Sequence, residues 1–229
     1  MFTAAPHPDL KLRVFVSTLP APLGQVSAPA WLSALLHPGA KCRLKRPAGL
    51  TGAVRDMLAV GGYDARSREP TRARRLMSQA LEGGLPALNF AADAARGASL
   101  QSGFSISLAD ADRLRGPLSV RLGAPGEVLA VEGGDLDASG LVCLFDEVGP
   151  ALSPARDAPR AEPDDTTTRL LSVIWGAGDD EHLDRATFWY SEMFERIGAS
   201  TAPIVWVSYG DRPGQPEVPD LPWSPPFPR

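Results

Sequence analysis

The segment from residue 93 to residue 107 holds acidic, basic and hydroxyl side chains at spacings that could serve one reaction. Arg96 follows Asp93 by three residues, so on a helix the two side chains share a face and can form an ion pair. The paired guanidinium could then donate hydrogen bonds to a carbonyl or carboxylate group of a substrate. Ser105 and Ser107 alternate with apolar residues and therefore lie on one side of a strand. An equally good interpretation is that Asp93 and Arg96 only stabilise a helix end.

Two other patterns could carry chemistry, and both have a simpler explanation. Ser99 lies in a sequence close to the nucleophile elbow of serine hydrolases, but Gln101 replaces the last glycine and a helix is predicted where the elbow needs a strand. The acids of residues 179–181 precede His182, but acidic residues at a helix start usually cap the helix. The sequence contains no P-loop or Rossmann fingerprint. We therefore expect no metal and no cofactor.

Five arginines lie close together in the segment from residue 66 to residue 75. On a loop that leads into a helix, arginines can contact successive phosphates of a nucleic acid. The alternative is a solvated helix face balanced by Glu69 and Glu82, and the net charge of −4 favours that alternative when the residues are considered alone. The arginines are Arg66, Arg68, Arg72, Arg74 and Arg75.

Composition indicates a globular protein with a sizeable core. The 229 residues are 44% hydrophobic and 22% charged. The net charge argues against broad, non-specific nucleic-acid binding but allows a local basic patch, and we expect no DNA partner. The sequence has no long apolar run, so we expect neither a membrane span nor a secretion signal. Cys42 and Cys143 are too few for a disulfide scaffold, so we expect a reduced, cytoplasmic setting.

The predicted elements that position these residues belong to one α+β domain. Residues 88–98 read as an alanine-rich helix, and residues 181–197 read as a helix with one apolar face. The strand of residues 12–17 is expected at a sheet edge. A strand at residues 128–131 is expected to join the strand after it through the turn at residues 133–135, and the chain after residue 210 is rich in proline. We expect a central sheet built from residues 104–108, 118–122, 141–145 and 170–175.

An ordered series of residues over roughly positions 50–200 is typical of one known family. The residues are Leu85, Pro86, Asn89, Asp93, Ser99, Leu100, Gly103, Asp110, Asp112, Arg121, Gly126 and Glu127, with Val54, Arg55, Asp56, Gly61, Gly62, Tyr63 and Arg66 upstream and Asp146, Glu147, Arg156 and Asp157 downstream. Their order resembles the editing (B3/B4) domain of the bacterial phenylalanyl-tRNA synthetase beta subunit, and particularly its free-standing relatives.

The resemblance implies mixed sheets packed with helices in layers (β/β/α), with residues 1–49 as a cover, residues 50–200 as the domain itself and residues 201–229 as a last strand and tail. In the synthetase, the domain hydrolyses the ester of tyrosine wrongly attached to the phenylalanine tRNA. That chemistry needs a cavity, hydrogen-bond donors at the ester oxygen and a positioned water. By resemblance, the partner is the aminoacylated end of a tRNA, with RNA contacts from the five arginines.

The resemblance also assigns site residues, and the departures from the family leave the activity open. Catalytic positions would be Asp93, Arg96 and Ser107; in the synthetase, asparagine stands at the position of Arg96 and histidine at that of Ser107. The synthetase's Gly-Gly-Glu segment has no counterpart in residues 154–160. The sequence therefore predicts either a deacylase for mischarged aminoacyl-tRNA acting in trans, or a binding module for tRNA or an amino-acid-like ligand, and no aminoacylation. Substrate-binding positions would be Asn89, Ser99, Ser105, Arg156 and Asp157.

Overall fold

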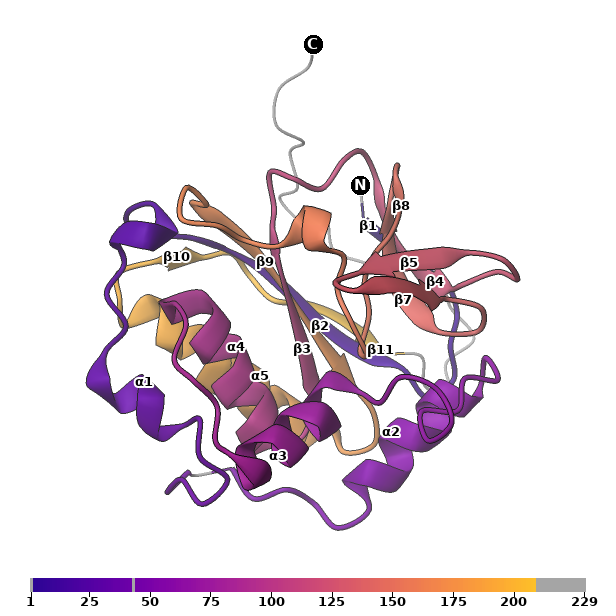
Figure 1. The fold of residues 1–229 in the computed structure, drawn as a ribbon, viewed down its shortest axis with the longest axis horizontal. Coiled ribbons are helices and arrows are strands. Elements are labelled where there is room, and N and C mark those ends of the chain that lie inside the picture. Colours follow the sequence, from indigo (N-terminus) through magenta and orange to yellow (C-terminus); the bar gives the residue numbers. More distant parts are fainter. Residues whose placement is uncertain (1, 43, 209–229) are drawn as a thin grey trace.

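The computed structural model describes residues 2–42 and 44–208 (Figure 1). The strands are β1 (Phe2–Ala4), β2 (Lys11–Thr18), β3 (Ser105–Asp110), β4 (Leu118–Leu122), β5 (Val128–Val131), β6 (Gly134–Asp137), β7 (Val142–Asp146), β8 (Gly149–Leu152), β9 (Arg169–Gly176), β10 (Ser200–Thr201) and β11 (Val205–Ser208). The helices are α1 (Ala30–Ala34), α2 (Leu50–Ala59), α3 (Arg72–Glu82), α4 (Phe90–Ser102) and α5 (Asp180–Glu195), with short 3-10 turns η1 (Leu23–Gln25) and η2 (Pro159–Ala161). The proline-rich end predicted after residue 210 lies outside the described residues.

The larger sheet has the order β10-β2-β9-β3, with β11 also paired to β2. Strand β2 runs antiparallel to β9 over its whole length, from Lys11 opposite Gly176 to Thr18 opposite Arg169. The prediction that residues 12–17 form an edge strand was wrong, because β10 and β11 pair with the side of β2 that faces away from β9. A strand this apolar is better placed in the interior of a sheet, where both of its faces can be covered.

The smaller sheet has the order β1-β4-β7-β8, and β1 is parallel to β4. The four strands expected in one central sheet are therefore divided, with β3 and β9 in the larger sheet and β4 and β7 in the smaller one. The predicted pairing of residues 128–131 with the strand near residue 141 was also wrong. Strand β5 forms a separate hairpin with β6, since Gly133 and Gly134 adopt positive φ and close a tight turn between them.

The sheets and helices form the predicted β/β/α layers, which confirms the α+β fold class. One apolar core lies between the sheets, where Val14 and Val173 meet Val120 and Leu144. A second core lies on the opposite face of the larger sheet, where α4 and α5 cover β2, β3 and β9 (Figure 1). The long helix predicted at residues 181–197 is confirmed as α5. Asp179 precedes it as the N-cap, and its carboxylate accepts hydrogen bonds from the backbone of the first turn.

Helix α2 and the segment before β7 approach each other through two glycines. A Cβ atom built on Gly61 would overlap the backbone carbonyl of Gly140, and a Cβ atom on Gly140 would overlap the carbonyl of Gly61. Gly140 also has φ +71°, which favours glycine. The contact holds the end of α2 against the smaller sheet.

Replacing Gly61 with alanine should therefore destabilise the protein by about 1–3 kcal/mol, because one backbone segment has to move. The control is Gly52→Ala, inside helix α2, where the new Cβ would meet only the end of the Arg55 side chain. Alanine at this helical position should stabilise the protein by about 0.5–1 kcal/mol. Urea unfolding of both variants measures the difference, and equal stabilities would contradict the close contact.

Candidate functional site

A buried polar cluster forms where β3, β9, the start of α3 and the loop after β8 meet. Its members are Arg72, Ser107, Asp157 and Trp175, and we call it the Asp157 cluster. The Ser107 hydroxyl lies 2.7 Å from Asp157 Oδ1 and accepts a hydrogen bond from Trp175 Nε1 at 2.9 Å. Arg72 Nη2 lies 2.5 Å from Asp157 Oδ2. The cluster joins residues that are up to 103 positions apart in the sequence.

Local structure explains why these side chains meet. Phe104 and Ile106 point into the core beneath the helices, so alternation along the strand turns Ser105 and Ser107 toward the smaller sheet. The Ser153 hydroxyl accepts hydrogen bonds from two backbone N–H groups of its own loop and thereby closes the turn that presents Asp157. Helix α3 is attached to this loop, because the Arg72 N–H donates to the Pro154 carbonyl at 2.8 Å.

The charges around Asp157 oppose one another. Burial raises the pKa of the Asp157 carboxyl above its ordinary value, while Arg72 and the Ser107 hydroxyl act in the opposite direction. The Ser107 hydroxyl has one proton and lies near two acceptors, Asp157 Oδ1 and the Ser153 carbonyl at 3.0 Å. Ser107 is fully buried, so its hydroxyl connects the cluster internally and has no surface that a substrate could contact.

Above the Asp157 cluster lie three partly exposed guanidinium groups, which we call the arginine rim: Arg72, Arg75 and Arg156. Their side chains are 23, 21 and 34% exposed, respectively. Glu69 lies between two of them, with Oε1 2.6 Å from Arg75 Nη1 and 3.4 Å from Arg156 Nε. Among the described residues, the buried Nε atoms of Arg72 and Arg156 have no hydrogen-bond partner. Because these two Nε atoms are buried, a ligand could contact only the exposed part of the three side chains. The three guanidinium groups share two carboxylates, Asp157 and Glu69, so the rim keeps one positive charge in excess.

Asp93 and Arg96 form the predicted ion pair, with Arg96 Nη1 3.0 Å from Asp93 Oδ1. The Asp93 carboxylate also accepts from the Leu88 N–H, and Arg96 donates to the Pro86 carbonyl at 2.8 Å. The pair thus fastens the segment between α3 and α4. Arg96 lines an open groove of about 520 Å³ together with residues 79 and 82–86, and none of Ser105, Ser107 or Asp157 is part of that lining.

The site residues predicted from the sequence are thus divided between two places. Ser107, Asp157 and Arg156 lie at the cluster and rim, whereas Arg96 lines the groove and Asp93 is buried behind it as its ion-pair partner. Two further serines hold backbone: Ser99 accepts a hydrogen bond from the Ile106 N–H, and Ser105 accepts one from the Ala73 N–H. Asn89 caps α4 by accepting from the Ala92 N–H at 2.9 Å. Their roles toward a substrate remain predictions.

The five arginines of residues 66–75 also have different surroundings. Arg72 and Arg75 belong to the rim. Arg68 lies over the Tyr63 ring and donates to the Ser139 carbonyl at 2.9 Å, so it joins the loop between α2 and α3 to the segment before β7. Arg66 is 70% exposed and pairs with Asp64. Arg74 is exposed and has no carboxylate partner within residues 2–42 and 44–208. Of the five, only Arg74 is therefore both exposed and unpaired among the described residues, while the exposed Arg66 shares its charge with Asp64.

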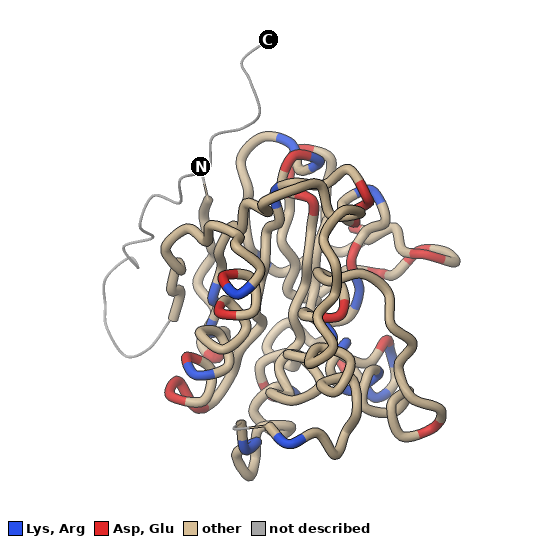
Figure 2. The backbone as a smooth tube through the Cα atoms, turned by 90° about the vertical axis from the view of Figure 1, so that its left-hand side faces the viewer, with Lys and Arg blue, Asp and Glu red and all other residues tan. Residues whose placement is uncertain are grey.

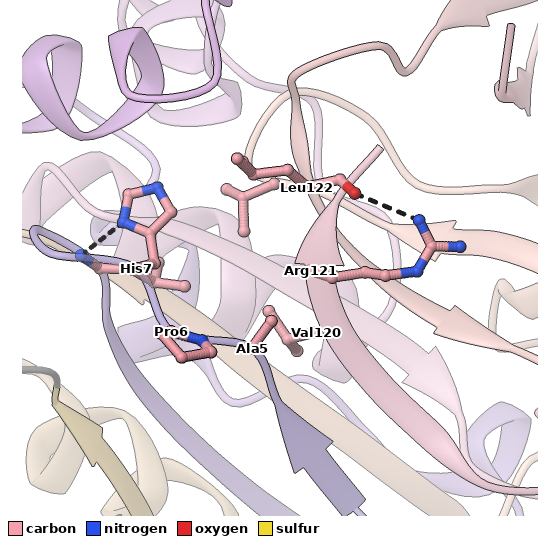
Figure 3. A pocket seen from close by; sticks show the side chains of 8 residues that line it. Ala5, Pro6, His7, Val120, Arg121 and Leu122 are labelled. Carbon is pink, nitrogen blue, oxygen red and sulfur yellow. Dashed lines mark hydrogen bonds between the residues drawn. The ribbon is translucent and has the colours of Figure 1, made fainter. Parts of the chain in front are cut away.

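A small cavity of about 150 Å³ lies between the start of β2 and β4, and sequence reasoning missed it (Figure 3). His7 is 4% exposed and lines this cavity. Its Nδ1 accepts a hydrogen bond from the Leu10 N–H at 3.1 Å, while Arg121 extends away from the ring toward the Leu122 carbonyl (Figure 3). The sequence did not predict that His7 is buried, because a single histidine with no second histidine or cysteine at a ligand spacing forms no recognisable motif.

Among the described residues, no cluster of three or more histidine, cysteine, aspartate or glutamate side chains is arranged to hold a metal ion. No helix in the same part of the chain is long and apolar enough to cross a membrane.

Comparisons with known proteins give structural likenesses but no match in sequence. No protein-family profile and no curated protein matches the chain. Among solved structures, an N-terminal fragment of the phenylalanyl-tRNA synthetase beta subunit from Pyrococcus horikoshii aligns with 87% of the chain at 12% sequence identity and a TM-score of 0.45. The alignment covers 49% of that fragment, so the chain spans about half of its length.

Removal of the Ser107 hydroxyl tests whether the Asp157 cluster stabilises the protein. Ser107→Ala should lower the free energy of unfolding by about 1–3 kcal/mol, since the buried Trp175 N–H loses its acceptor. Ser78→Ala, at an exposed position of α3, is the control and should change stability by less than about 0.5 kcal/mol. Unfolding in urea measures both. An unchanged stability in Ser107→Ala would mean that the hydrogen bonds of Ser107 contribute nothing to the fold.

His7 should make the stability depend on pH. Burial lowers its pKa, against smaller raising effects from Asp9, its own backbone and the Met57 backbone. The folded protein then binds fewer protons than the unfolded chain, so stability falls as the pH drops below about 6.5 and stops falling below the lowered pKa. In His7→Asn the amide oxygen can replace Nδ1 as acceptor, and this part of the pH dependence should disappear. The exposed His37→Asn is the control, and two identical pH profiles would refute the assignment.

Proposed function

We propose that the chain is a free-standing tRNA-binding module that takes the aminoacylated end of a tRNA at the arginine rim and hydrolyses its ester in trans. One observation carries this proposal: three partly exposed guanidinium groups are held together over a buried Asp157, and only two carboxylates, Asp157 and Glu69, pair with them. Arg156 and Asp157 are also among the residues that resemble the editing domain. The residues of the resemblance and the positively charged arginine rim thus lie at the same place, where guanidinium groups can donate hydrogen bonds to an ester oxygen.

The proposed chemistry uses positioning and needs no protein nucleophile. A water adds to the ester carbonyl, the carbonyl oxygen becomes negative, and the bond to the ribose oxygen then breaks, so that the free amino acid and the tRNA hydroxyl are formed. Guanidinium donors placed at that oxygen stabilise the developing charge. Arg156 is suited to this role because its carboxylate contact is the longer of the two at Glu69. Ser107 is excluded from direct attack by its burial and serves to position Asp157.

The second candidate is a module that binds the same tRNA end and does not hydrolyse it. It is favoured by the absence of an unpaired carboxylate or imidazole in the cluster and rim, since Asp157 is paired with Arg72 and Glu69 with Arg75. Hydrolysis would then depend on a base from the substrate itself, such as the terminal ribose hydroxyl that the resemblance suggests. Binding and turnover can be measured separately, so the two candidates are distinguishable.

The decisive experiment is a deacylation assay over a panel of mischarged tRNAs. The full chain should release the amino acid from at least one of them, and Arg156→Ala should reduce that rate by about 100-fold, the usual cost of one donor at an oxyanion. Arg169→Ala is the matched control, because Arg169 is also an arginine of about the same exposure, at 28%, with one carboxylate partner, Asp112. Its rate should equal that of the unsubstituted chain.

The other outcomes separate the candidates. Binding of aminoacyl-tRNA that weakens in Arg156→Ala, together with no turnover of any substrate, would establish the binding module and refute hydrolysis. A chain that neither binds nor hydrolyses any tRNA of the panel would refute both. Melting temperatures of the two arginine variants show whether a lost activity reflects unfolding.

A further inference from the structure

The basic residues of this acidic protein are distributed unevenly along the chain. Between residues 10 and 55 the sequence has seven lysines and arginines and no aspartate or glutamate, although the whole chain has a net charge of −4. Four of the seven lie within six consecutive positions, before α2. The seven are Lys11, Arg13, Lys41, Arg43, Lys45, Arg46 and Arg55, of which Arg43 lies outside the described residues.

Lys41, Lys45 and Arg46 form what we call the basic loop. Both lysines are exposed, and neither has a carboxylate partner in the described part of the chain. Figure 2 shows this loop at the bottom of the molecule, with blue segments and no red segment in the same loop. The arginine-rich segment of residues 66–75 differs in this respect, since four of its five arginines pair with carboxylates. The basic loop therefore presents positive charge that the protein does not neutralise itself.

The loop is fastened at both ends to the C-terminal end of α4. The Gln101 side chain donates to the carbonyls of Leu35 and His37, at 2.8 and 2.9 Å, just before the loop. After it, the Arg46 guanidinium donates to the carbonyls of Leu100 and Gln101. Arg46 thus satisfies carbonyls at a helix end, where positive charge is favourable. This explanation does not extend to the two lysines, which make no such contact.

The basic loop lies close to the arginine rim through the connection between α4 and β3. Arg46 contacts carbonyls at residues 100 and 101, and the Ala73 N–H, in the first turn of α3, donates to Ser105. Arg72 of the rim precedes Ala73 directly. Only a few residues of backbone therefore separate the two positively charged sites, and one extended ligand can contact both.

We infer that Lys41 and Lys45 of the basic loop bind backbone phosphates of the RNA whose aminoacylated end occupies the arginine rim. The inference rests on the proposed function and names the surface that holds the rest of the partner. Lysines act as point charges toward phosphate and need no particular base sequence. An RNA backbone fits better than a membrane, because residues 37–49 include no aromatic side chain and the single leucine among them, Leu44, is partly buried against the core.

The test compares the salt dependence of tRNA binding in three proteins: the full chain, the double variant Lys41→Ala/Lys45→Ala, and the double variant Arg115→Ala/Arg196→Ala. Arg115 and Arg196 are also exposed and without carboxylate partners in the described part of the chain, so both variants lose two free positive charges. Loss of two phosphate contacts should reduce the log–log slope of affinity against salt by about 1.4–1.8. The control variant should keep the slope of the full chain, and melting temperatures should be the same in all three.

Each result has a distinct meaning. If the full chain binds tRNA and Lys41→Ala/Lys45→Ala has the same slope as the full chain and the control variant, phosphate binding by the basic loop is refuted while the proposed function stands. If the full chain shows no binding that weakens with salt, the proposed function and the basic loop both fail. A parallel measurement uses vesicles that contain phosphatidylserine. Vesicle binding that is lost only in Lys41→Ala/Lys45→Ala, with tRNA binding unchanged, would assign the loop to a lipid surface and overturn the RNA assignment.

Discussion

Strand β9 is buried on both of its faces, and this double burial determines where the other layers can lie. Leu170 and Ile174 need the cover that α4 and α5 provide, while Val173 and Trp175 need the smaller sheet. Trp175 brings an indole N–H into the core between the two sheets, where an unpaired hydrogen-bond donor is costly. Ser107 on the neighbouring strand accepts that hydrogen, its hydroxyl contacts Asp157, and Asp157 in turn pairs with Arg72. The polar cluster beneath the arginine rim is thus a consequence of how the apolar core is closed.

Pairing of charged side chains within the protein explains why the charge composition says little about the binding partner. Most arginines among the described residues pair with carboxylates of the protein itself. Arg121 forms a bidentate pair with Glu127 and lowers the pKa of Glu127 to about 2, and Arg160 forms a bidentate pair with Asp146. An arginine in such a pair has little positive potential left for a phosphate. The net charge of −4 and the local surplus at the basic loop are therefore compatible, because the neutralised pairs contribute almost nothing to the outward field.

Local patterns predicted the elements well and their partners poorly. The apolar face of α5, the strands and the ion pair of Asp93 with Arg96 follow from spacing within one segment. Alternation along a strand shows which face is buried, but it does not show which sheet the strand joins, so the division into two sheets and the interior place of β2 could not be read from the sequence. Several residues that carry the family resemblance have a structural role: Asn89 caps α4, Gly103 ends α4 with φ +86°, and Arg121 pairs with Glu127. Such residues identify a backbone arrangement more directly than a reaction.

The arginine rim and the Asp157 carboxyl are coupled through Arg72, and this coupling bears on what the site can bind. Burial raises the pKa of Asp157 and the pairing with Arg72 opposes that rise. An anionic or strongly polar oxygen that draws the Arg72 guanidinium toward the surface would weaken the pairing, and the carboxyl would then take up a proton more readily. Ligand binding and proton uptake therefore favour each other at this place. A protonated Asp157 can donate to Ser107, which frees the single Ser107 proton for the Ser153 carbonyl, while Trp175 still donates to Ser107. The cluster can thus lose the charge of Asp157 and keep the hydrogen bonds of Ser107, and the rim above it keeps its positive charge for the ligand.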